Sequence, residues 1–143
     1  MFSQNTAEKF EGTPGYSFLK YNYHECPNSN LDPEDGIETH YDKILLCSRC
    51  GNQITSYSEG ATIHGSFEHS FLNPDGIMYQ IGCFKKAAGC ISSERFILEF
   101  TWFHPFPWCF VFCSDCGRQL GWKYKSNNND VFYGLILKLL CSM

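Results

Sequence analysis

From Ile44 onward, hydrophobic residues recur in short runs that are separated by polar turn residues. Runs of this length suit β-strands better than helices. The last run, 132–140, lacks β alternation and is compatible with either a helix or a strand. The pattern predicts a mostly antiparallel β domain, with strands expected in the runs 44–46, 67–72, 77–84, 96–103, 108–112 and 120–124.

Turn residues separate these runs at four places. Asn-Pro-Asp-Gly occupies 73–76, His-Pro-Phe-Pro occupies 104–107, Cys116-Gly117 follows the fifth run, and a polar stretch covers 126–130. Asn-Pro and Asp-Gly are specific turn dipeptides. We therefore expect reversals of the chain at these positions.

The first 43 residues differ from the rest of the chain. They mix Asn, Ser, Pro, Glu and Gly, which favours turns and little regular structure. Four apolar residues, Phe18, Leu19, Tyr21 and Tyr23, could still pack against a neighbouring domain. The sequence predicts an irregular N-terminal extension over 1–43 and a folded β domain over 44–143.

Composition narrows the class of protein. The chain has 143 residues, 17% aromatic and 18% charged, which fits one self-sufficient core rather than disorder. A formal net charge of -4 argues against nucleic-acid binding, because binding to phosphates needs clustered lysines and arginines. No secretory signal and no apolar run of about twenty residues is seen, so no membrane span is expected. We expect an intracellular protein whose nine cysteines are mostly thiols or metal ligands.

Two Cys-x-x-Cys pairs predict a metal site. Cys47 and Cys50 form the first pair, Cys113 and Cys116 the second, and a glycine follows each pair at once. Two such turns can aim four sulfur atoms at one ion at Zn–S distances of about 2.3 Å. Four thiolates leave no open coordination position, so the predicted site is a structural zinc and not a catalytic one.

All three tryptophans fall within 21 residues, at Trp102, Trp108 and Trp122. An ordinary aromatic core is one interpretation. The other is a pocket, because Trp102 and Trp108 flank the proline-containing turn and Trp122 follows the second cysteine pair closely. From the residues alone both interpretations stay open.

An ordered set of motifs resembles one family. The set comprises the two cysteine pairs, Asn73-Pro74-x-Gly76, Glu99-Phe-Thr-Trp-Phe103, Trp108, Gly121-Trp-Lys-Tyr124 and Phe132-Tyr-Gly-Leu135. In spacing and order it is similar to the CULT domain, the thalidomide-binding domain of cereblon, over about 46–140. The resemblance implies a β-tent fold of two roughly orthogonal antiparallel sheets joined near the zinc.

The resemblance also implies a ligand, a flat cyclic imide such as glutarimide or a uracil-like ring. Trp102, Trp108 and Trp122 would cover its faces, and Tyr124 would close the floor. The imide edge would meet backbone groups of Phe100, Thr101 and Trp102, since a desolvated imide without hydrogen bonds costs several kcal/mol, roughly 2 to 7. Asn73 and Pro74, on the opposite turn, would reach a substituent outside the cage.

This chain departs from the animal members of the family at Phe100, where they have a histidine. We expect contacts with the imide to be made mainly by the backbone, and binding to be weaker by no more than about 1 kcal/mol. A protein C-terminus cyclised to an imide is a further candidate ligand. In the family the domain selects substrates for a ubiquitin ligase. Contact with the ligase adaptor is not expected here, because the sequence has no room for the regions that bind the adaptor.

Two other functions remain as alternatives to a non-enzymatic binding module. Methionine sulfoxide reductases of the B type share the β-tent and the four-cysteine zinc site. If this chain were such an enzyme, Cys109 or Cys83 would have to be its catalytic thiol. The other alternative is a zinc-dependent domain that binds proteins or RNA. The net negative charge of the chain argues against RNA binding. No nucleophile with a base and an orienting group is evident among the remaining residues.

Overall fold

A computed structural model of the chain describes residue 26 and residues 43–142. Apart from Cys26 and Lys43, the expected N-terminal extension therefore lies outside the described residues. Within the described part, every regular element is a strand or a single 3-10 turn, which confirms the prediction of a mostly β fold. No helix there is long and apolar enough to cross a membrane.

Nine strands and two 3-10 turns make up the described fold. In chain order they are β1 (Ile44–Cys47), β2 (Gln53–Ser56), η4 (Tyr57–Glu59), β3 (Glu68–Leu72), β4 (Met78–Phe84), β5 (Cys90–Ser92), β6 (Trp108–Cys113), β7 (Gln119–Lys125), β8 (Val131–Ile136), η5 (Leu137–Leu139) and β9 (Leu140–Ser142).

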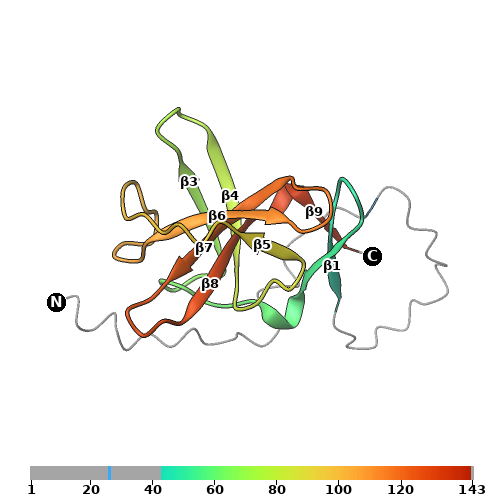
Figure 1. Cartoon of the computed structure of the whole chain (residues 1–143), viewed down its shortest axis with the longest axis horizontal. Helices are drawn as coiled ribbons and strands as arrows, with labels where there is room; N and C mark the ends of the chain where they lie inside the picture. The colour runs from blue at the N-terminus through green and yellow to red at the C-terminus, as the bar shows by residue number, and fades with distance from the viewer. Residues whose placement is uncertain (1–25, 27–42, 143) are drawn as a thin grey trace.

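The strands form two antiparallel sheets. The larger sheet has six strands in the order β3-β4-β8-β7-β6-β5, and the smaller has three in the order β2-β1-β9. The short turn η5 carries the chain from β8 in the larger sheet to β9 in the smaller one. Figure 1 shows β1 and β9 on the right and the β3–β4 hairpin projecting at the top.

Two clusters of buried side chains lie on the larger sheet. One joins the two sheets and includes Leu45 and Leu140 from the smaller sheet with Val111 and Leu135 from the larger. The other is rich in aromatic rings and is built around Phe103, Tyr124 and Phe132, all at most 1% exposed. The aromatic cluster lies next to the predicted cage, because Trp122 belongs to it and Trp102 and Trp108 pack against it.

The prediction of a strand over 96–103 is wrong. The structure has a loop there, with only an isolated bridge between Ile97 and Trp108. Phe100 has a left-handed backbone with φ of 61°, which breaks the extended conformation. The hydroxyl of Thr101 donates to the carbonyl of Phe106 at 2.6 Å and holds the loop folded back on itself. Within the run, only Phe103 is buried in the core, and Phe100 and Trp102 line the cavity. Ile97 and Leu98 are 45% and 53% exposed, so the hydrophobic composition does not mark a paired strand here.

The turns predicted at 73–76 and 126–130 are confirmed. The first closes the β3–β4 hairpin, with Gly76 N–H donating to the Asn73 carbonyl at 2.9 Å and Gly76 at φ of 81°. In the second, Ser126 N–H donates to the Asp130 carbonyl at 2.8 Å. The run 132–140, left open between helix and strand, contains most of β8, then η5 and the start of β9.

Candidate ligand-binding cavity and metal centre

The two cysteine pairs fold into matching turns. In each, the N–H of the following glycine donates to the carbonyl of the first cysteine, at 2.8 Å for Gly51 and 2.9 Å for Gly117. Both glycines have a left-handed backbone, with φ of 78° and 77°, and both have open space where a Cβ would stand. Glycine is therefore needed for its backbone conformation and not for lack of room.

The turns bring four sulfur atoms together. The Sγ atoms of Cys47, Cys50, Cys113 and Cys116 all lie within 4.8 Å of one another. Cys47 and Cys116 are 3.8 Å apart, and Cys50 and Cys113 are 3.5 Å apart. A tetrahedron with Zn–S bonds of about 2.3 Å has S···S edges of about 3.8 Å. The four cysteines can therefore hold one metal ion.

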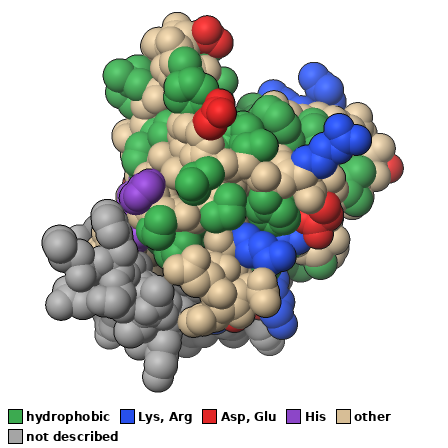
Figure 2. Space-filling view, turned by 60° about the vertical axis from the view of Figure 1, so that its left-hand side comes forward, with side chains coloured by type: hydrophobic (Ala, Val, Ile, Leu, Met, Phe, Trp, Pro, Cys, Tyr) green, Lys and Arg blue, Asp and Glu red, His purple; other side chains and the backbone are tan. Residues whose placement is uncertain are grey.

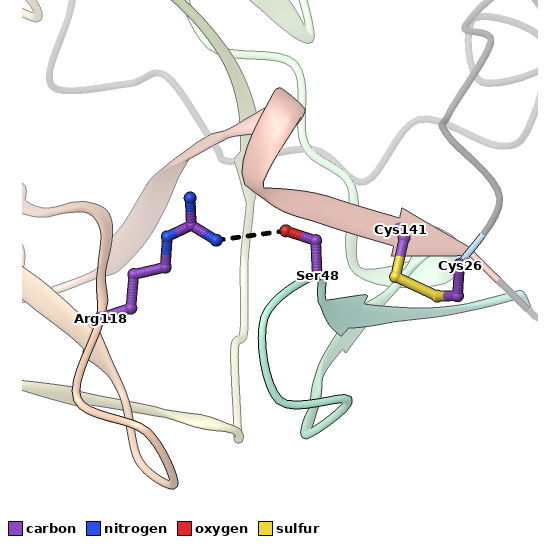
Figure 3. Close-up of a disulfide and its surroundings, with 4 residues drawn as sticks. All are labelled: Cys26, Ser48, Arg118 and Cys141. Atoms are coloured by element: carbon purple, nitrogen blue, oxygen red, sulfur yellow. Dashed lines mark hydrogen bonds between the residues drawn. A yellow bond between two sulfur atoms is a disulfide. The ribbon is translucent and has the colours of Figure 1, made fainter. Parts of the chain in front are cut away.

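Polar neighbours tie the two turns together. Asn52 donates its side-chain amide to Cys113 Sγ at 3.6 Å, to Ser114 Oγ at 3.2 Å and to the Gly89 carbonyl at 3.2 Å. Arg118 donates to Ser48 Oγ at 3.3 Å (Figure 3). Burial opposes ionisation of the Cys113 thiol, but the backbone N–H groups of Cys116 and Asp115 lower its pKa to about 6. The thiolate, the form that binds a metal, is thus favoured at Cys113. At Cys50 the backbone hydrogen bond from Asn52 lowers the pKa, but burial and hydrogen bonds with the other three cysteines outweigh it and raise the pKa to about 12.

A disulfide joins Cys26 to Cys141 on β9, with the two Cα atoms 5.0 Å apart (Figure 3). Neither cysteine was assigned a partner from the sequence, which predicted mostly thiols and metal ligands. The cysteines lie 115 residues apart, so no local spacing could have indicated the pair. The other described cysteines outside the metal cluster, Cys83, Cys90 and Cys109, are free.

A cavity of about 350 Å³ opens on the larger sheet. Seven of the eight residues predicted for the ligand site line it; Thr101 does not. The sequence reasoning missed the other lining residues. Together the lining consists of Asn73, Pro74, Asp75, Tyr79, Phe100, Trp102, Trp108, Phe110, Gln119, Trp122 and Tyr124.

Three separate segments supply the indoles of the cavity. Trp102 comes from the loop before β6, Trp108 begins β6, and Trp122 lies in β7. Trp102 and Trp122 form a corner, with ring centroids 4.8 Å apart and planes at 74°. Trp108 makes a ring contact only with Phe110 among the described residues. The cavity is thus lined by an indole corner and by a third indole that does not touch it.

Hydrogen bonds and stacking fix the first two indoles. Trp102 Nε1 donates to the Leu72 carbonyl at 3.2 Å, and Trp108 Nε1 donates to the Glu99 carbonyl at 2.8 Å. Phe71 on β3 stacks on Trp102 with centroids 5.0 Å apart and planes at 11°. Phe71 does not itself line the cavity, and nothing in the sequence showed which ring it would meet.

The exposure of the lining residues distinguishes the bottom of the cavity from its mouth. Trp122 is 9% exposed and Tyr124 only 1%, whereas Phe100 is 71% exposed and Phe110 is 41% exposed. Burial also raises the pKa of the Tyr124 phenol, which therefore stays neutral. The bottom is aromatic and dry, and the mouth is open to water.

No protein-family model matches the chain. The chain is, however, similar in sequence to curated cereblon proteins. A stretch of 98 residues is 29% identical to cereblon of Gallus gallus and, separately, to cereblon of Xenopus tropicalis, covering 64% of this chain and 22% of each relative. Cereblon of Drosophila erecta is 22% identical over 102 residues, 66% of this chain and 17% of that protein. The chain is cereblon-like.

The cereblon-like relationship covers only part of the relatives. The chain spans about a fifth of the length of the vertebrate cereblons it matches. The matches therefore bear on one region of those proteins. They agree with the family that the motifs around the cysteine pairs and the tryptophans indicated.

Proposed function

We propose that the cavity binds a cyclic imide between Trp102, Trp108 and Trp122. The ligand class includes glutarimide, uracil-like rings and protein C-termini cyclised to an imide. The observation that carries the proposal is the convergence of the three indoles, from three segments, on one cavity. A volume of about 350 Å³ is at the small end of ligand pockets, which run from roughly 300 to 1,000 Å³.

Polar groups next to the cavity match the edge of such a ring. Among the described residues, neither the backbone N–H nor the carbonyl of Phe100 forms a hydrogen bond. The indole N–H of Trp122 also has no acceptor there, although the side chain is only 9% exposed. A buried donor without a partner costs about 1 to 3 kcal/mol. An imide, with one N–H between two carbonyls, offers both a donor and acceptors to such groups.

We also propose that the four-cysteine site holds zinc as a structural ion. Zinc accepts four thiolates in tetrahedral geometry. Here Cys47 lies on β1 of the smaller sheet and Cys113 on β6 of the larger sheet. An ion at this place would link the two sheets and support β6, the strand that begins with Trp108.

Calorimetric titration of the zinc-loaded protein with glutarimide tests the binding proposal. We expect one saturable site, lost in Trp102→Ala and in Trp122→Ala and retained in Ile91→Ala, which changes an exposed side chain away from the cavity. N-methylglutarimide, which lacks the N–H, should bind at least about tenfold more weakly, because a polar partner is left unmet. Near-ultraviolet circular dichroism checks that the variants fold. No heat of binding from a folded, zinc-replete protein would refute the proposal.

The reductase alternative receives no support from the two candidate thiols. Cys83 and Cys109 are both 0% exposed. Burial raises the pKa of each thiol, whereas a catalytic cysteine needs an accessible, low-pKa thiolate. Methionine sulfoxide turnover with a thiol reductant is the direct test, and turnover lost in Cys109→Ser would restore this alternative.

A further inference from the structure

The mouth of the cavity carries a charge that the imide cage itself does not require. Asp75, at the tip of the β3–β4 hairpin, is the one residue with a formal charge among the lining residues that the structure describes. No lysine or arginine is part of that lining. In Figure 2 the hairpin forms the top of the molecule, where acidic and hydrophobic side chains occur without basic ones.

Exposure places Asp75 at the mouth rather than at the bottom. Asp75 and Pro74 are exposed, as are the rings of Phe100 and Phe110, at 71% and 41%. The buried indole of Trp122 lies at the opposite end of this gradient, at 9%. A small ring held by the indoles would therefore direct any substituent toward Asp75, Phe100 and Phe110.

From this arrangement we infer that the cavity selects cyclic imides whose substituent carries a cation. This inference rests on the proposed function, because the imide must first occupy the cage. A carboxylate attracts an ammonium group through space, and an exposed phenyl ring adds a cation–π contact. Asn73 and Gln119, which also line the cavity, are neutral and would not oppose the cation.

Hydrogen bonds hold the backbone of the hairpin turn that carries Asp75. Asn73 Oδ1 accepts a hydrogen bond from Ile77 N–H at 2.8 Å, and Asn73 N–H donates to the Ile77 carbonyl at 2.9 Å. Trp102 Nε1 bonds the Leu72 carbonyl at the base of the same turn. The backbone of the tip that carries Asp75 is therefore linked to Trp102, which keeps the carboxylate within reach of a substituent on a bound ring.

The effect is expected to be modest, since the carboxylate is exposed and screened by salt. Exposed pairs of opposite charge change an equilibrium by about two- to fivefold. The preference should decrease with ionic strength, because the Debye length shortens from about 30 Å at 0.01 M salt to about 8 Å at 0.15 M.

Three amides of 3-aminoglutarimide, measured by calorimetry on the full chain, test the inference. The glycyl amide carries an ammonium group, the propionyl amide replaces that group by a methyl group of similar size, and the succinyl amide carries a carboxylate. At low salt we expect the glycyl amide to bind about threefold tighter than the propionyl amide, and the succinyl amide to bind most weakly.

Two variants locate the source of the preference. Asp75→Asn should make the glycyl and propionyl amides bind equally. Asp130→Asn, which removes the same charge from the exposed turn between β7 and β8, should leave the preference unchanged. Equal affinity of the amides for the unmodified protein, or a preference that persists in Asp75→Asn, would overturn the inference and leave imide binding intact. If none of the amides binds, the proposed function fails as well.

Discussion

At the scale of single residues, the structure separates residues that line the cavity from residues that shape it. Thr101 was predicted for the ligand site, but it lies outside the cavity lining. Its hydroxyl donates to the Phe106 carbonyl at 2.6 Å, and its Oγ1 accepts the Phe103 N–H at 3.3 Å. Thr101 therefore holds the loop that presents Phe100 and Trp102.

Replacing Thr101 by valine tests this role. Valine keeps the shape of the side chain but removes both hydrogen bonds, so we expect unfolding free energy to fall by about 1 to 2 kcal/mol. Urea denaturation measures the change. Thr101→Ser, which retains a hydroxyl, should lose less unfolding free energy than Thr101→Val. Equal losses in the two variants would show that the hydroxyl does not hold the loop.

The sequence singled out the three tryptophans and the four cysteines because these residues are chemically distinctive. Tryptophans clustered within 21 residues and cysteines with a fixed spacing can be recognised without coordinates. Phe71 and Tyr79 could not be recognised in this way, because the chain has 13 phenylalanines and 8 tyrosines. Only the fold shows that Phe71 stacks on Trp102 and that Tyr79 meets Trp122 at 5.3 Å.

At the scale of elements, β7 belongs to the larger sheet and also contributes side chains to the cavity. Its residues Trp122 and Tyr124 contribute to the cavity, while Lys123 forms an ion pair with Glu94 at 3.2 Å. Gly121 lies opposite Leu135 of β8, and a Cβ at Gly121 would overlap the carbonyl oxygen of Gly134. The close approach of β7 and β8 therefore depends on a glycine beside Trp122.

Gly121→Ala should force the two strands apart. We expect a loss of about 1 to 3 kcal/mol of unfolding free energy from overpacking. Gly65→Ala is the comparison, because its Cβ would meet nothing within 4 Å and only its φ of 83° would be strained. Thermal denaturation of both variants measures the difference. A loss no greater for Gly121→Ala than for Gly65→Ala would contradict the packing argument.

Strand prediction succeeded where hydrophobic runs were bounded by strong turns. It missed short strands and assigned one strand to a loop. β2 (Gln-Ile-Thr-Ser) and β5 (Cys-Ile-Ser) were not predicted, because each is short and contains a single isoleucine rather than a hydrophobic run. The run 96–103 was predicted as a strand because its composition resembles one. A loop that carries apolar side chains, some buried as Phe103 and some exposed as Leu98, has the same local pattern as a strand.

At the scale of the whole molecule, the metal site joins segments that are distant in the sequence. Cys50 and Cys113 are 63 positions apart, yet their Sγ atoms are 3.5 Å apart. An ion at this site would hold the two sheets together near the cluster of buried residues that contains Cys47 and Cys113. The cysteine spacing predicted the four ligands, and the family resemblance predicted two antiparallel sheets near them, which the structure has.

Removal of the metal should therefore destabilise both sheets. With a strong chelator we expect the melting temperature to fall and added Zn²⁺ to restore it, because metal binding is coupled to folding. Cys50→Ser should lower the metal content, whereas Cys90→Ala, a change to a free cysteine outside the cluster, should leave one ion per chain. Metal analysis and differential scanning calorimetry provide the readouts. An unchanged melting temperature after complete removal would argue against a structural ion.

The pairing of β1 with β9 has a consequence for the order of events during synthesis. β1 is the first described strand and β9 the last, and their register pairs Leu46 with Cys141. While a ribosome is still adding the intervening residues, β1 has only β2 as a neighbour. The smaller sheet can therefore form completely only after β9 has been synthesised. Until then the edge of β1 stays unpaired and can bind chaperones or other nascent copies of the chain.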